Sequence, residues 1–214
     1  HPHGILPIGS MVNIAGNVTG FEDLFPGIER RGLAASFTFY IPFYRDLLLG
    51  GGICDAARYS AHRILAEGKS LFLVPGGATE ALYSHPLKDV LYLSKRKGFV
   101  KLALQHGAAL VPCFGFNECG LFDQFTGDYP LLDKIKHGFQ RVFGISLPII
   151  KNIIPRRAKI TTVVGPPIEC PKIENPTIEE IDKYLKTYMV ALEQLYEEHK
   201  HLNEPSNKPP LKIL

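Results

Sequence analysis

Hydrophobic residues occur along this chain in short runs that stop at glycine or proline. Residues 70–74 form one apolar run, which ends at Pro75, and residues 109–114 form another. Runs of this length bounded by turn residues are typical of buried strands. Residues 159–164 alternate and are rich in β-branched side chains, which predicts a third strand that Gly165 halts.

Three other segments are predicted to be helical. Residues 54–67 lead directly into the strand expected at residue 70, and Ser94 can cap a helix that ends at Gly107. A long third helix starts at Thr177, which forms a capping box with Glu180. Two helix-to-strand units in succession predict a single α/β domain with a mixed or mostly parallel sheet flanked by helices.

Length and composition fit one globular domain. With 214 residues and 45% hydrophobic content, the chain can bury a sizeable core. We expect a domain over residues 1–200 and a polar, Pro-containing, loosely held tail over residues 201–214. The chain has no initiator Met and no signal peptide, so we expect a fragment whose upstream residues are missing.

Charge and cysteine usage exclude several classes of protein. The net charge of +3 is small, and it gives no reason to expect a nucleic-acid partner. The four cysteines contain no CxxC pair, which favours a reducing, cytosol-facing location over a disulfide scaffold. No apolar run approaches the roughly 18 residues that span a bilayer.

The first four residues, His1-Pro2-His3-Gly4, carry the first candidate chemistry. Two histidines beside Pro and Gly, followed by apolar residues, suit a general base at the end of a strand. A structural role for these histidines is the alternative. We expect no metal, because the sequence contains no HExxH, CxxC or comparable ligand set.

A glycine-rich turn and a basic block follow downstream. Gly76 and Gly77 expose backbone amides that can hold an oxyanion or a phosphate, and Glu80 follows one turn later. Glu80 could equally be an ordinary charge at a helix N-terminus. Residues 95–101 contain four cations near a predicted helix start, which suits a phosphate or simply a solvated face.

These blocks together resemble the type-2 diacylglycerol acyltransferase family, which includes monoacylglycerol and wax-alcohol acyltransferases. The resemblance rests on residues 1–4, on residues 75–82 (PGGATEAL) and on residues 96–103 (RKGFVKLA), in the family's order. It continues through Leu110-Val111-Pro112 and residues 114–118, and it covers nearly the whole chain to about Glu198. The combined pattern is far more specific than any one block.

The resemblance implies transfer of a long-chain acyl group from acyl-CoA to a neutral lipid hydroxyl, with acyl-CoA as co-substrate and no further cofactor. Diacylglycerol, giving triacylglycerol, is the expected acceptor. Monoacylglycerol, a fatty alcohol and a non-catalytic lipid- or CoA-binding fragment are the alternatives. The family also implies the cytosolic face of the endoplasmic reticulum membrane and lipid droplets. The oligomeric state stays open, and a homo-oligomer is one partner to test.

The resemblance also divides the chemistry among residues. Either His1 or His3 would act as the base, and the sequence does not decide between them. Glu80 would orient the imidazole, and the Gly76 and Gly77 amides would stabilise the oxyanion. The phosphates of CoA would bind three cations of the basic block, namely Arg96, Lys97 and Lys101. A cysteine acyl-enzyme, with Cys54, Cys113 or Cys119, is the rival mechanism.

One more segment suggests how the chain meets a membrane. Residues 134–159 contain seven cations and no acid around the apolar run of residues 142–150. Such a segment suits the surface of an anionic bilayer, and a buried turn flanked by lysines is the equal alternative.

Overall fold

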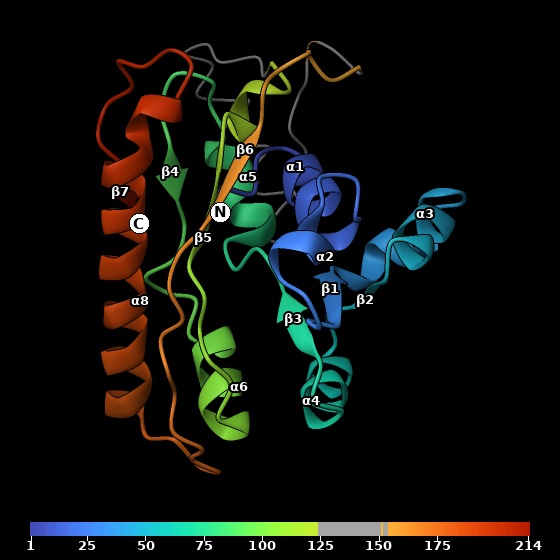
Figure 1. Ribbon diagram of the computed structural model, residues 1–214, viewed down its shortest axis with the longest axis vertical. Coiled ribbons are helices and arrows are strands. Elements are labelled where there is room, and N and C mark those ends of the chain that lie inside the picture. The colour runs from blue at the N-terminus through green and yellow to red at the C-terminus, as the bar shows by residue number, and fades with distance from the viewer. Residues whose placement is uncertain (124–150, 152–153) are drawn as a thin grey trace, which may run out of the picture.

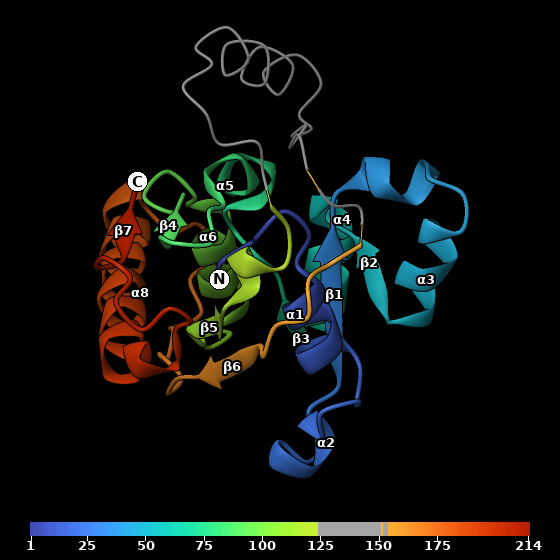
Figure 2. The same cartoon turned by 90° about the horizontal axis from the view of Figure 1, so that it is seen from above.

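The protein has the α/β architecture that the sequence predicts. Its structure is a computed structural model, which describes residues 1–123, 151 and 154–214. The described strands are distributed over three small sheets, two parallel and one antiparallel, with helices packed around them. Figures 1 and 2 show two halves, with the amino-terminal segment between them.

The first half is built on a parallel sheet in the order β2-β1-β3. Its elements along the chain are β1 (Arg30–Ala34), the 3₁₀ helix η2 (Ser36–Tyr40), α3 (Tyr44–Gly50), β2 (Ile53–Asp55), α4 (Arg58–Ala66) and β3 (Ser70–Phe72). Gly32 lies in the central strand, where an added Cβ would approach the side chains of Ile53 and Phe72 to 2.4 Å. The close packing of β1 therefore requires a glycine there.

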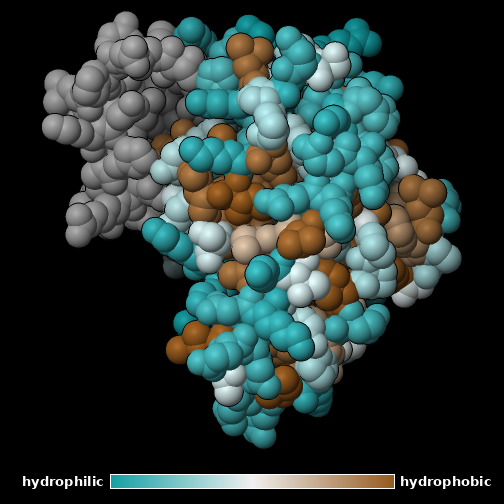
Figure 3. Space-filling view, turned by 90° about the vertical axis from the view of Figure 1, so that its left-hand side faces the viewer, coloured by the Kyte–Doolittle hydropathy of each residue, from teal (hydrophilic) through white to brown (hydrophobic). Residues whose placement is uncertain are grey.

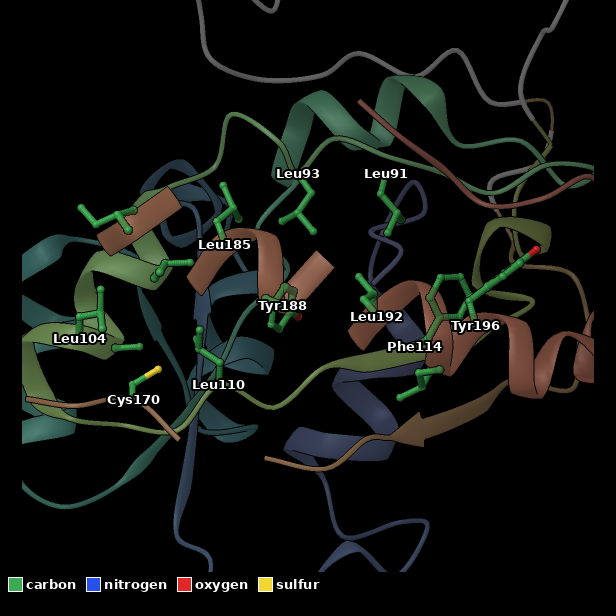
Figure 4. Close-up of a cluster of buried hydrophobic side chains, with 14 of the residues drawn as sticks. Leu91, Leu93, Leu104, Leu110, Phe114, Cys170, Leu185, Tyr188, Leu192 and Tyr196 are labelled. Carbon is green, nitrogen blue, oxygen red and sulfur yellow. The ribbon is translucent and has the colours of Figure 1, made fainter. Parts of the chain in front are cut away.

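The second half contains the main hydrophobic core. Its elements are β4 (Val90–Leu91), α6 (Gly98–His106), β5 (Cys113–Phe116), β6 (Thr161–Val164), α8 (Ile178–His199) and β7 (Lys212–Ile213). β5 and β6 pair antiparallel, and β4 and β7 pair parallel. Figure 4 shows Leu104 from α6, Phe114 from β5 and Leu192 from α8 within one buried cluster.

The remaining described elements are short. They are α1 (Ile8–Ser10), the π-helical η1 (Met11–Ala15), α2 (Phe21–Leu24), α5 (Gly77–Tyr83) and the 3₁₀ helices η3 (Glu118–Gly120) and η4 (Lys200–Leu202). The N-terminus lies near α5 and β5 in Figure 2. Residues far apart in sequence thus meet around the first four residues.

The predicted element types are largely confirmed, and several boundaries differ. Cys54 and Asp55 are in β2, and the helix expected from residue 54 begins at Arg58. Asp55 ends the strand because its carboxylate turns back to accept the N–H of Ala57 at 2.9 Å. Ser94 does not cap α6, because the helix begins at Gly98 and its N-cap position is Lys97. The Ser94 N–H donates to the carbonyl of Leu214 instead.

The long helix α8 begins where its sequence predicts. Thr177 and Glu180 form the expected capping box. The buried residues of α8 follow one apolar face, whereas Ile178, at the first position of the helix, is exposed. Figure 3 looks onto the side of the molecule that α8 occupies, where hydrophilic residues cover much of the surface. This amphipathic pattern packs α8 against the core.

The segment from residue 201 onward packs more tightly than the loosely held tail expected from its composition. Lys212 and Ile213 form β7 beside β4, and the Lys208 amine lies 3.3 Å from a carboxylate oxygen of Asp89. Both of these side chains are almost fully buried. The polar composition of this segment did not reveal that it packs on the domain. The residues it contacts lie far earlier in the chain: Asp89 and Lys208 are 119 residues apart.

Two expectations about membranes meet the structure differently. The predicted interfacial segment, residues 134–159, lies mainly outside the described residues, so it stays a prediction. Over residues 1–123, 151 and 154–214, none of the helices combines the length and apolar character needed to cross a bilayer.

Candidate functional site

The first four residues lie against the edge of β5. The Gly115 N–H donates to the carbonyl of His1 at 2.6 Å, which fixes the segment beside the strand. Gly4 then turns the chain with a φ of +59°, in the left-handed region that favours glycine. A side chain at Gly4 would also place its Cβ 3.2 Å from Cγ of Glu118. The turn therefore requires Gly at this position.

Glu80 lies behind the segment, almost completely buried at 1% exposure. Its Oε1 accepts the backbone N–H of His3 at 2.7 Å, and its Oε2 accepts the N–H of Tyr92 at 2.9 Å. The Nδ1 atom of His1 lies 3.4 Å from the same Oε1. Burial raises the pKa of Glu80, while these N–H donors favour its ionised form.

The two histidines differ in what they can reach. The His1 side chain is 1% exposed, packs near the Tyr188 ring and contacts Glu80. Its Nε2 is buried, with no hydrogen-bond partner among the described residues. A ring enclosed in this way cannot contact a substrate without moving.

His3 instead lines a cavity. Its Nδ1 lies 3.1 Å from the Gly4 carbonyl, which can only accept, so Nδ1 carries the proton. The lone pair is then on Nε2, which makes no hydrogen bond within the described part of the chain. Burial lowers the pKa of His3, so the ring is neutral near pH 7. A neutral imidazole with an available Nε2 is the form in which histidine takes a proton.

The cavity beside His3 has a volume of about 830 Å³ and a mainly apolar lining. Its wall comes from strands of the first sheet and from the helices around them, and it includes Leu48 of α3, Phe72 of β3, Ala81 of α5 and Phe99 of α6. Its size is typical of a ligand site, for which about 300–1,000 Å³ is usual. A second hollow of about 580 Å³, by Arg30 and Arg31, contains none of the predicted site residues.

The glycine-rich turn supports Glu80 directly. An added Cβ at Gly76 would lie 2.0 Å from Oε2 of Glu80, so the absence of a side chain there makes room for the carboxylate. The Gly77 N–H donates to the carbonyl of Val74 at 3.1 Å. The Gly77 amide, predicted to bind an oxyanion, thus already has an acceptor within the turn.

The three cations predicted to bind CoA lie in different surroundings. Arg96 donates to the Gly76 carbonyl at 3.0 Å and to Oγ1 of Thr79 at 2.8 Å, so it fastens the start of α5. Lys97 forms an ion pair with Asp182 of α8. Lys101 is the member of this group that lines the cavity.

Sequence reasoning missed Arg58, a second cation on the cavity wall. It is the first residue of α4, directly after the parallel strand β2. Ligands of α/β proteins commonly bind where a helix follows the carboxyl end of a parallel strand. The sequence did contain this cation near the start of a predicted helix. However, because the helix was expected to begin at residue 54, Arg58 was placed in its second turn and not at its start.

Two of the three candidate cysteines, Cys113 and Cys119, do not resemble activated nucleophiles. Burial raises the pKa of Cys113, and it raises the pKa of Cys119 to about 12. A reactive cysteine needs a lowered pKa, because the thiolate is the nucleophile. This environment disfavours an acyl-enzyme on either residue.

The fold and the site define an α/β enzyme in which a neutral histidine, whose backbone is held by a buried carboxylate, adjoins an apolar cavity with Arg58 and Lys101 in its wall. The comparisons make this class specific. A family model described as diacylglycerol acyltransferase matches residues 1–213, and the chain belongs to this family. This confirms the prediction, made from the three sequence blocks, of an O-acyltransferase of neutral lipids.

The relatives include enzymes named for different acceptors. Diacylglycerol O-acyltransferase 2 of Dictyostelium discoideum is 38% identical over 225 residues, covering 100% of this chain and 68% of the relative. The human 2-acylglycerol O-acyltransferase 3 is 40% identical and acyl-CoA wax alcohol acyltransferase 1 is 39% identical, each covering 94% of this chain. The match spans 63% and 65% of those two human proteins. No solved structure matches the chain.

Proposed function

We propose that this chain transfers a long-chain acyl group from acyl-CoA to the free hydroxyl of diacylglycerol, with His3 as the general base. The observation that carries the assignment is the neutral His3 ring, which has its Nε2 available beside an apolar cavity. Family membership supports the reaction class, and the relatives named for diacylglycerol support the acceptor.

The chemistry follows from the position of the ring. The acceptor oxygen attacks the thioester carbonyl carbon while Nε2 of His3 takes the hydroxyl proton. The tetrahedral intermediate then collapses, the carbon–sulfur bond breaks, and the imidazolium returns its proton to the CoA thiolate. This general-base step is worth typically 10²–10⁴-fold in rate. Glu80 holds the backbone of His3 in place during these steps.

Lys101 and Arg58 are the proposed partners for the phosphates of CoA. Both line the cavity that contains His3, whereas Lys97 is paired with Asp182. Cations at the wall of an apolar cavity can bind the phosphates while the acyl chain enters the interior. The cavity is also lined by Gln105 and His62, which add polar groups near these cations.

An acceptor panel tests the assignment. Membranes containing the complete protein receive one labelled acyl-CoA and, in turn, diacylglycerol, monoacylglycerol and a fatty alcohol. We expect diacylglycerol to give the highest kcat/KM. A higher value for either other acceptor would contradict the proposed acceptor. Acyl-CoA binding without transfer to any acceptor would identify a non-catalytic binding protein.

We also propose that η2 and α3 contact the lipid bilayer, at the cytosolic face of the endoplasmic reticulum or on a lipid droplet. In Figures 1 and 2 this arm stands out from the body on the side away from α8. It exposes large apolar side chains, with Tyr40 at 85% and Phe43 at 87% exposure. Its inner side chains, including Tyr44 and Leu48, line the cavity. A lipid could therefore pass from the bilayer to the cavity along one element.

Liposome flotation tests the arm. Replacing Phe43 and Leu47 with Ser should lower the fraction bound to neutral and anionic liposomes, because it removes apolar area from the contact. Leu24→Ser changes an exposed apolar residue outside the arm and is the matched control. Unchanged flotation of the double variant contradicts the proposal. Concentration-dependent self-association abolished by the same changes would instead make the arm a contact between copies.

A further inference from the structure

Glu118 is a second buried carboxylate near the histidines. It is 3% exposed and lies at the start of η3, directly after β5. Its Oε1 accepts the N–H of Gly9 at 2.9 Å, and the neighbouring amides of Ile8 and Ser10 also donate to this carboxylate. Three successive backbone N–H groups thus surround one carboxylate that comes from 109 residues later in the chain.

The backbone around Glu118 leaves no room for side chains. A Cβ at Gly9 would lie 2.0 Å from Oε2 of Glu118, and a Cβ at Gly4 would lie 3.2 Å from its Cγ. The Glu118 side chain therefore packs on Gly4 with its stem and binds residues 8–10 with its carboxylate. Gly76 makes the same accommodation for Glu80, at 2.0 Å from its Oε2.

This contact bears on the base because Gly4 and His3 are joined. The Gly4 carbonyl accepts the proton of His3 Nδ1 at 3.1 Å, so the position of this carbonyl sets both the tautomer and the direction of the ring. Ile5, Leu6 and Pro7, between the two points that Glu118 holds, form part of the cavity wall. Glu80 meanwhile holds the N–H of His3 itself.

We propose that Glu118 is a positioning residue for the reaction: it fixes residues 4–10 and, through the Gly4 carbonyl, aims the His3 ring at the cavity. The inference rests on the proposed role of His3 as the base. Glu118 does not contact the ring, so its effect passes through the backbone. A displacement of about 1 Å in a reacting group can lower a rate 10²-fold.

The ionisation of Glu118 gives the proposal a pH signature. Burial raises the pKa of Glu118 to about 7, although the three N–H donors favour its ionised form. The ionised carboxylate is the stronger acceptor for N–H groups, so the clamp weakens as pH falls through about 7. The pKa of His3 lies below its usual 6.5, so protonation of the base begins at lower pH.

The test compares kcat against pH for the complete protein and for Glu118→Gln. In the complete protein, kcat should fall as pH drops through about 7. We expect the Gln variant to lose this fall and to show a kcat reduced roughly 10- to 100-fold at about pH 8. Its KM for acyl-CoA should stay within about twofold. The remaining loss of activity at low pH then belongs to His3. Asn117→Gly is the matched control, because the Asn117 side chain binds Lys159, Leu202 and Glu204 but not residues 4–10.

Asn117→Gly should lower the melting temperature and leave the pH profile of the folded enzyme unchanged. A Glu118→Gln variant that behaves in the same way would show a structural role alone and overturn the proposal. If His3→Ala retains turnover, the base assignment fails instead. The failure of the Glu118 proposal and the failure of the base assignment are distinguishable, because only the His3→Ala result tests His3 itself.

Discussion

At the scale of single residues, burial distinguishes two neighbouring histidines. His1 and His3 are separated by one proline, yet the His1 ring lies between Glu80 and Tyr188 while His3 lines the cavity. Successive side chains of an extended segment point to opposite sides, and residues two apart share a side only when the backbone is regular. Here the two rings lie in different surroundings, although they are two residues apart.

His3→Ala should lower kcat by roughly 10²–10⁴-fold, because it removes the proposed base without disturbing the Glu80 contact, which uses the His3 backbone. His1→Ala should instead lower the melting temperature and keep kcat within about 10-fold, because it empties a buried position. Turnover and thermal unfolding of both variants check this. The reverse pattern would assign the base to His1.

At the scale of elements, the residues at the start of the seven-residue helix α5 contact one another and the segments around them. Gly76 makes room for the Glu80 carboxylate, the Gly77 N–H closes a turn onto Val74, and Arg96 binds the Gly76 carbonyl. The glycines and the glutamate of this block are thus linked by packing. Their spacing in the sequence indicates a joint role, which the structure shows to be support of the carboxylate.

Gly76→Ala should abolish most activity, because its Cβ would lie 2.0 Å from Glu80 Oε2 and force the carboxylate away from His3. Gly50→Ala is the control: nothing lies within 4 Å of the added Cβ at the end of α3. There the change should be neutral or stabilising by up to about 1 kcal/mol. Equal activity of both variants, measured at equal folded concentration, would contradict the packing role of Gly76.

At the scale of the whole molecule, the carboxyl-terminal segment closes the second half of the fold. The carboxylate of Asp89 accepts hydrogen bonds from Lys208 and from the hydroxyl of Tyr196, which lies within the main core. Burial raises the pKa of Asp89, and the Lys208 charge opposes that shift. Removing one partner of a buried ion pair of this kind destabilises the fold, because the other charge is left buried and unpaired.

Lys208→Ala should therefore lower the free energy of unfolding by about 3–5 kcal/mol, because it leaves Asp89 buried without its cation. Lys212→Ala, at an exposed position of β7, should change it by about 0.5 kcal/mol or less. Denaturant unfolding of the two variants measures the difference. Similar values for both would show that the tail is held without the ion pair.

The sequence by itself determined what depends on neighbouring residues. The capping box at Thr177, the left-handed stop of α6 at Gly107 and the strand at residues 161–164 were predictable because each signal lies within a few positions. The order of the histidine, glycine-rich and basic blocks was enough to predict the family.

Only the tertiary structure decided how these blocks meet. It separates the reachable His3 from the enclosed His1, places Lys101 and Arg58 on the cavity wall, and brings Glu118 onto residues 8–10. The contacts that join the site span 77 residues between His3 and Glu80 and 109 between Gly9 and Glu118. Local propensity carries no information about such distant partners, because packing and burial choose them only when the whole core forms.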